Sequence, residues 1–353
     1  MAKRIVLHIG ARKTGTTYLQ HGLRTRRREL GSAGARYPTS IGLFRLLKNH
    51  ELPLLAALRQ LSQPWMNSDD HMNYDAIWSR IRRDIDCTNG TVILSAEALA
   101  SLDSKAIADV PQVLGCEHIR VVITMRDLGR VLPSTWQQHV RNGYSTGYEP
   151  YLESISHQRA FLDLPGTAHQ DTDANFWASF APGPLVRRWQ EISDDIALVT
   201  VPRAPGRPEE LWERFWAALD LPGPAAPPPE ASVTPNHHRG LPAGPAYLLC
   251  ETMRDLQRRG VDIQKRRKIA MRLGREMLAR PTGKKLQLPV PETWRNLVQA
   301  WAEHDRDGVE GSRVYGDLSD LQPQHSPDIS DEVLASEITR AAAVAFRRER
   351  WYV

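Results

Sequence analysis

The amino-acid sequence predicts an α/β fold in which a parallel central sheet is flanked by helices, with further helices added at the C-terminal end. Two patterns predict it. Over the first 140 residues, short runs that are apolar throughout alternate with helical patterns, as in parallel sheets that helices cover on both faces. After about residue 240 the patterns are helical almost throughout. A chain of 353 residues, 41% of them hydrophobic, is long enough to bury such a core.

The predicted strands are four apolar runs bounded by glycine or by other turn residues. They cover residues 5–9, 91–95, 119–125 and 196–201. The helical patterns between them cover residues 17–29, 74–85, 104–114 and about 133–141. Because strands and helices alternate in this way, we expect a doubly wound sheet.

A proline-dense stretch over residues 202–245 ends the alternation, interrupted by one predicted helix over residues 209–219. Residues 313–318 form either a late strand or a turn. The remaining helical patterns cover residues 246–259, 264–279, 291–304 and 331–348. We therefore expect an α/β core over residues 1–220, and a proline-rich wrap with a helical extension over residues 221–353 that packs on the same domain.

Charge and composition exclude several classes of protein. The net charge is +5, but the excess is concentrated in a basic block over residues 254–285, so no nucleic-acid partner is expected. The block forms either a solvated helix face or the mouth of a site, where it would attract an anionic substrate.

No run approaches the ~20 apolar residues of a membrane span, and the N-terminal run is too short for a secretion signal. We expect a cytoplasmic protein whose three cysteines are reduced and form neither disulfides nor a zinc site.

The most informative segment follows the first predicted strand. Residues 9–19 comprise the strand end, a loop flanked by Gly10 and Gly15, and the start of a helix. The backbone N–H groups of such a loop, with a helix N-terminus behind them, form an anion-binding concavity. In the loop that binds nucleoside triphosphates, a lysine follows the second glycine. Here Thr16 takes that place and Lys13 lies three residues earlier, where it suits the bridging oxygen of a group on a single 5′-phosphate better than a γ-phosphate.

Residues 10–17 resemble the 5′-phosphosulfate loop of sulfotransferases that use 3′-phosphoadenosine 5′-phosphosulfate (PAPS). The resemblance implies a P-loop-like α/β fold and transfer of a sulfuryl group to a hydroxyl or amine, with no essential metal and with 3′-phosphoadenosine 5′-phosphate (PAP) as product. It places Lys13 at the leaving phosphate oxygen. The residues that it implies as donor contacts are Arg12, Lys13, Thr14, Gly15, Thr16 and Thr17. The alternative is an ordinary glycine turn between strand and helix.

The same family has a second phosphate site, in which an arginine at a strand end and a serine about eight residues later bind the 3′-phosphate. Arg126 follows the third apolar run, and Ser134 lies at that distance. A guanidinium binds phosphate bidentately. With Pro133 at the first position of a helix, Ser134 would lie in the first turn, where free N–H groups favour an anion. The family usually has proline where this chain has Leu128, so we expect a different local backbone. The alternative for Arg126 is a surface salt bridge with Asp127.

Glu97 is the candidate general base that deprotonates the acceptor. It follows the second apolar run, and α/β sheets bind ligands in crevices at the carboxyl ends of their strands. Bacterial sulfotransferases look similar here, with Ser-x-Glu, and Ser95 is expected to orient the acceptor or to contact the nucleotide. The alternatives are that Glu97 caps the next helix and that His139, His237 or His238 is the base.

The sequence therefore predicts a PAPS-dependent sulfotransferase that acts by in-line transfer on a small-molecule or glycan acceptor. In addition, Arg239 is expected to contact the nucleotide, and one of Trp65, Trp136 and Trp177 to stack on the adenine or on an aromatic acceptor. Two alternatives stay open. A P-loop kinase or NTPase would need a lysine at position 16 and an acidic magnesium ligand. A non-catalytic PAP-binding module would keep both phosphate sites without transfer.

Overall fold

The computed structural model describes residues 4–39, 47, 49–61, 73–159, 175–203, 208–223, 226–228, 240–280, 286–309 and 312–346. Contacts between Cα atoms divide the chain into two compact units. The first unit comprises residues 1–127, 158–233 and 300–322, and the second unit comprises residues 128–157, 234–299 and 323–353. The packing of residues 221–353 on the core domain stays a prediction.

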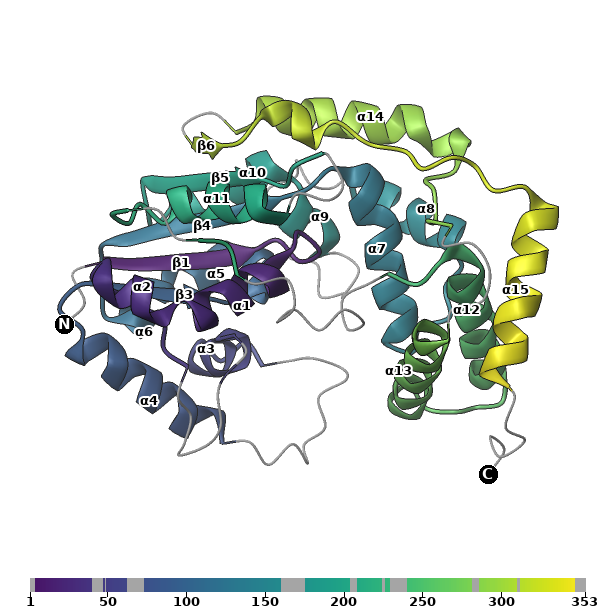
Figure 1. The fold of residues 1–353 in the computed structure, drawn as a ribbon, viewed down its shortest axis with the longest axis horizontal. Helices are drawn as coiled ribbons and strands as arrows, with labels where there is room; N and C mark the ends of the chain where they lie inside the picture. The colour runs from purple at the N-terminus through teal and green to yellow at the C-terminus, as the bar shows by residue number, and fades with distance from the viewer. Residues whose placement is uncertain are drawn as a thin grey trace. The chain divides into compact units, whose positions relative to one another are not determined.

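The first unit is built on one parallel sheet (Figure 1). Within the described residues its strands are β1 (Arg4–Gly10), β2 (Ala35–Arg36), β3 (Thr91–Ser95), β4 (Ile119–Met125), β5 (Asp195–Thr200) and β6 (Arg313–Tyr315). Their order across the sheet is β2-β3-β1-β4-β5-β6, and every neighbouring pair is parallel. The predicted P-loop-like α/β class is confirmed, and the late segment whose nature the sequence left open is a strand.

Both faces of the sheet are covered by helices, which is why most positions of its central strands are apolar. Ile5, Leu7 and Ile9 of β1 belong to the hydrophobic core on one face, and Val6 belongs to the core on the other. The first core is covered by α3 (Glu51–Ala57), α4 (Tyr74–Cys87), α5 (Ser104–Ala108), α6 (Val110–Leu114) and α10 (Pro182–Gln190). The second core is covered by α1 (Thr16–Thr25), α2 (Arg27–Ser32) and α11 (Pro208–Ala218) (Figure 1).

The second unit is helical, as predicted for most of the C-terminal part of the chain. It contains α7 (Leu128–Arg141), α12 (Ala243–Arg258), α13 (Ile263–Ala279), α15 (Asp331–Ala345), most of α8 (Tyr148–Arg159) and the first half of α14 (Glu292–Asp307). Trp136 of α7 is fully buried in it, with ring centroids 5.1 Å from Tyr148 and 5.4 Å from Tyr247. No helix of the described residues combines the length and apolar character that crossing a bilayer requires.

The predicted start of the helix near residue 133 is wrong. Helix α7 begins at Leu128, and Pro133 lies inside it. Leu128, Val131 and Leu132 are buried at helical spacing, so the apolar face of the helix extends one turn further toward the N-terminus than its proline indicates. As a consequence Ser134 lies in the second turn of α7, where backbone N–H groups are used within the helix, and not in the first.

Candidate functional site

The predicted donor loop and two of the predicted site residues follow three neighbouring strands. Strand β1 lies between β3 and β4, and all three run parallel. The loop follows β1, Glu97 comes two residues after β3, and Arg126 comes directly after β4. Because the carboxyl ends of parallel strands meet at one edge of a sheet, these groups lie together there.

The loop after β1 turns back on itself through residues with positive φ. Lys13 has φ 66° and Gly15 has φ 85°. The positive φ of Gly15 favours glycine, and a Cβ atom added there would lie 2.7 Å from Leu211 Cδ2, so the leucine side chain would have to shift. The left-handed conformation of Lys13 is uncommon for a residue with a side chain, and such conformations cluster at ligand-binding and active sites.

Two threonines, Thr14 and Thr124, stabilise the loop through hydrogen bonds to Ala11. The Ala11 N–H donates to the Thr124 carbonyl over 2.7 Å, and the Thr14 hydroxyl donates to the Ala11 carbonyl over 2.6 Å. Thr14 is fully buried, and its hydroxyl bonds both the Ala11 carbonyl and the Thr124 hydroxyl, so its side chain serves the loop. Helix α1 then starts at Thr16 with no acidic residue in its first turn and no side-chain cap from the described residues. An anion would be stabilised at this helix end.

Arg126 lies against the loop. Its Nη1 donates to the backbone carbonyl of Lys13 over 3.3 Å, and the side chain is only partly exposed. This contact ties the end of β4 to the loop after β1, so the cationic residues Lys13 and Arg126 lie on neighbouring backbone. The pair can neutralise an anion that carries more than one charge.

The carboxylate of Glu97 lies in the same group of residues. Its Oε1 accepts a hydrogen bond from Gln20 Nε2 over 3.1 Å, and the Thr16 hydroxyl donates to it as well. Burial raises the pKa of Glu97, and the negative charge of Glu51 raises it further. The Thr16 hydroxyl and the charges of Arg12 and Lys13 oppose that rise without cancelling it. A carboxylate with a raised pKa is a better proton acceptor than an exposed one.

Glu51 joins the cluster through an element that the sequence did not reveal, the helix α3. Its carboxylate accepts from Arg12 Nη2 over 2.9 Å and from the Ala98 N–H over 2.9 Å.

The residue before Glu51, His50, is buried, and its ring bonds the Pro38 carbonyl and the Ser95 N–H. His50 therefore fixes the start of α3 against the end of β3 and puts Glu51 beside the predicted base.

Two buried histidines make the stability of the first unit sensitive to acid. Burial lowers the pKa of His8 to about 3 and that of His50 to about 4, from 6.5. The unfolded chain takes up protons near pH 6.5 while the folded chain does not. This part of the stability is therefore complete above pH 6.5 and is lost as the pH falls, down to about 4 for His50 and about 3 for His8. The loss is about 1.4 kcal/mol per pH unit for each histidine.

Urea unfolding at pH 7, 6 and 5 measures this effect. We expect the free energy of unfolding to fall more steeply with acidity in the wild type than in His50→Gln, because the variant loses one of the two groups. The exposed His304 is the matched control, and His304→Gln should keep the wild-type slope. Equal slopes in the wild type and His50→Gln would contradict the assignment of a neutral, buried His50.

Several polar residues of the site escaped the sequence analysis. Gln20 donates to both Ser95 and Glu97, and His8 lies between Ser95 and Thr124. Ser95 is fully buried and bonded within this network, so its predicted role as a contact of acceptor or nucleotide is wrong. The sequence does carry a signal for two of them. His8 is the polar residue within the apolar run over residues 5–9, and Gln20 lies on the buried side of α1.

The remaining candidate residues belong neither to the loop after β1 nor to the strand ends. Ser134 belongs to α7 of the second unit, and Arg239, His237, His238 and Trp65 lie outside the described residues. His139 is packed in α7, with its ring stacked on Tyr144 at 4.2 Å. Trp136 and Trp177 are fully buried, so neither presents a ring to an adenine.

The basic block is largely a solvated helix surface on α12 and α13. Its ion pairs join residues three or four apart: Arg254 with Glu251, Arg259 with Asp255, Lys265 with Asp262, and Arg272 with Glu276. Such pairs stabilise a helix modestly and indicate no ligand. Residues 281–285 of the block lie outside the described residues.

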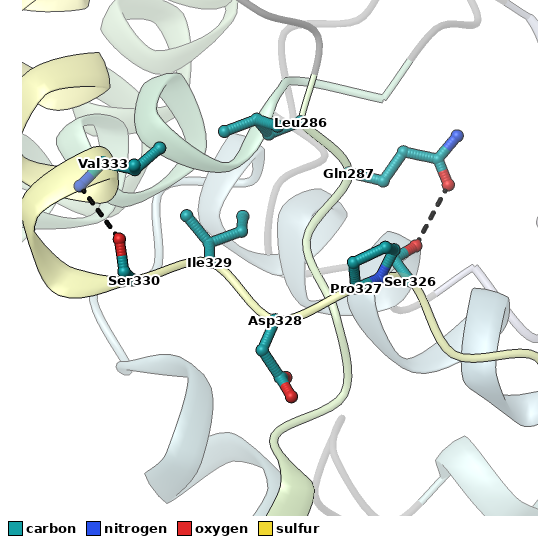
Figure 2. Close-up of a pocket in the computed structure, with 8 residues that line it drawn as sticks. All are labelled: Leu286, Gln287, Ser326, Pro327, Asp328, Ile329, Ser330 and Val333. Atoms are coloured by element: carbon teal, nitrogen blue, oxygen red, sulfur yellow. Dashed lines mark hydrogen bonds between the residues drawn. The ribbon is translucent and has the colours of Figure 1, made fainter.

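The second unit has a pocket at the start of α15, lined by residues 286–287, 326–330 and 333. Figure 2 shows Ile329 facing Leu286, with Asp328 directed away from them. Asp328 is paired with Arg295, and the Ser330 hydroxyl caps α15, so the polar groups here serve the fold. Among the described residues, no cluster of three or more His, Cys, Asp or Glu side chains is arranged to hold a metal ion.

No protein-family model matches the chain, and no curated protein matches it significantly. Among solved structures, the chain is similar to the crystal structure of a sulfotransferase from Alicyclobacillus acidocaldarius. The TM-score is 0.42 and the sequence identity 11%, over 77% of this chain and 97% of that chain.

Proposed function

We propose that this protein is a sulfotransferase that transfers the sulfuryl group of PAPS to a hydroxyl or amine of a small-molecule or glycan acceptor. One observation carries the proposal: the displaced lysine of the loop, Lys13, lies with Arg126 and Glu97 at the ends of three adjacent parallel strands. A loop for anions, two cations and a carboxylate with a raised pKa are what this transfer requires.

The donor fits the residues present. The 5′-phosphosulfate would lie on the N–H groups of the loop and of the first turn of α1, which has neither an acidic residue nor a side-chain cap. Lys13 would bind the bridging oxygen. Arg126 would bind the 3′-phosphate, for which Ser134 and Arg239 remain proposed further contacts. Thr16, at the position of the lysine in nucleoside-triphosphate loops, is buried and bonded to Glu97, which supports a donor without a γ-phosphate.

The chemical step is an in-line displacement at sulfur. The acceptor oxygen or nitrogen attacks the sulfur, and its proton passes to the Glu97 carboxylate. The bond between the sulfur and the bridging oxygen breaks, and its electron pair stays on the phosphate of PAP. Lys13 stabilises the negative charge that develops there, as cations do in phosphoryl transfer.

Thermal unfolding with added nucleotides tests the proposal. We expect PAP to raise the melting temperature clearly more than AMP, because only PAP carries the second phosphate. A larger shift with ATP and magnesium than with PAP would overturn the proposal in favour of a P-loop kinase or NTPase. Transfer of labelled sulfate from PAPS to a panel of phenols, sugars and amines then separates an enzyme from a module that only binds PAP.

A further inference from the structure

A series of hydrogen bonds connects the loop after β1 to Glu97. The donor and acceptor of the first bond determine which group donates and which accepts in each bond that follows. The Thr14 hydroxyl lies 2.6 Å from the Ala11 carbonyl, which can only accept, so Thr14 donates. Thr124 Oγ1 lies 2.6 Å from Thr14 Oγ1 and must then donate to it. With its proton used, Thr124 can only accept from the ring Nε2 of His8, at 3.3 Å. His8 therefore carries its proton on Nε2.

The same logic extends to the predicted base. The other ring nitrogen of His8, Nδ1, is an acceptor, so the Ser95 hydroxyl at 2.9 Å donates to it. Ser95 Oγ can then only accept, and Gln20 Nε2 donates to it over 3.0 Å. The same amide nitrogen lies 3.1 Å from Glu97 Oε1, so its two hydrogens serve the serine and the carboxylate. A flipped Gln20 would place its carbonyl oxygen against two acceptors, so only one amide orientation is allowed.

We propose that Gln20 is a positioning residue, whose amide holds the Glu97 carboxylate in one orientation while Ser95 and His8 fix that amide. The inference rests on the proposed function, in which Glu97 is the base. A neutral amide suits this role because it orients the carboxylate without neutralising it, whereas a cation in its place would make the carboxylate a weaker base. Gln20 is itself buried, where an amide without partners would be costly.

The other groups that face Glu97 come from every element around it. Glu51 comes from α3, Arg12 and Lys13 from the loop, Thr16 from α1, and the buried Tyr37 from the segment after β2. Arg12 binds Glu51 over 2.9 Å. The carboxylate therefore receives the hydrogen bonds that orient it from Gln20 and Thr16, both on α1.

Carbon-13 NMR of protein labelled at the glutamate side-chain carboxyl tests the inference without an acceptor. Loss of the Glu97 signal in Glu97→Gln assigns it, and the signal is then titrated in the wild type, Gln20→Met and Gln20→Asn. We expect the pKa of Glu97 to rise by about one pH unit in both variants, because the charged form loses a hydrogen-bond donor. The second variant serves if Gln20→Met fails to fold. Gln20→Asn keeps a polar side chain, but that side chain is too short to reach the Glu97 carboxylate.

Gln137 is the matched control. It is a buried glutamine of α7 whose amide bonds the backbone of Leu241, and Gln137→Met should leave the Glu97 titration unchanged. An unchanged midpoint in the Gln20 variants would overturn the inference. Melting temperatures with PAP test the proposed function separately from the role of Gln20. We expect PAP to stabilise the wild type and the Gln20 variants to the same extent. A wild type that PAP does not stabilise would contradict the proposed function, while the titration would still report whether Gln20 acts on Glu97.

Discussion

Replacing Glu97 with glutamine should lower the rate of sulfuryl transfer by a factor of about 10²–10⁴, the usual contribution of a general base. Glutamine has nearly the same shape, but its amide cannot accept the proton of the acceptor. The donor contacts proposed for Lys13 and Arg126 stay intact, so stabilisation by PAP should change little. The measurement is labelled sulfate transfer from PAPS, with the acceptor of the panel that reacts fastest with the wild type.

The exposed Glu213 of α11 supplies the control, and Glu213→Gln should transfer at the wild-type rate. Because burial and Glu51 raise the pKa of Glu97, the acid limb of the rate against pH should lie above the ordinary titration range of a glutamate. A Glu97→Gln variant with a rate within about threefold of the wild type would remove Glu97 as the base.

Replacing Arg126 with alanine should remove most of the difference between PAP and AMP as stabilisers. A charge-assisted, bidentate contact to the 3′-phosphate contributes about 1.5–3 kcal/mol, so PAP binding should weaken about ten- to a hundredfold. AMP lacks that phosphate and should bind almost as before. Calorimetric titration with PAP and with AMP measures both affinities.

Arg36 is the control for this substitution, since it is an exposed arginine of the first unit that pairs with Asp84. Arg36→Ala should leave both affinities unchanged. If Arg126→Ala weakened PAP and AMP equally, Arg126 would serve the loop through its bond to the Lys13 carbonyl and not the 3′-phosphate.

The core strands were predictable because the strands of a parallel sheet that helices cover on both faces are short, mostly apolar runs in the sequence. The predicted bounds of β3 and β4 agree with the structure, and β1 and β5 differ by one residue at their ends. Strand β2 is too short to show a pattern, and it is recognised only by its pairing with β3. The predicted helix over residues 17–29 is divided at Arg26 into α1 and α2, which a periodic pattern alone does not reveal.

The candidate site was partly predictable for the same reason. Lys13, Glu97 and Arg126 each follow a predicted strand, and parallel strands that are neighbours bring their carboxyl ends together. The hydrophobic pattern of the sequence, however, does not indicate which strands are neighbours in the sheet. Glu51 shows the limit: it belongs to a short helix far from any strand end, and the bonds of His50 to Pro38 and Ser95 bring it to the cluster.

Local information in the sequence was sufficient for the glycine loop, for the lysine displaced within it, and for the alternation that specifies an α/β core. Each depends on residues close together in the chain. The hydrogen bonds from Thr14 through His8 to Gln20 join residues up to 116 positions apart, and they exist only because β1 lies between β3 and β4. Burial then lowers the pKa of His8 and raises that of Glu97, since water is replaced by protein only once the chain has folded.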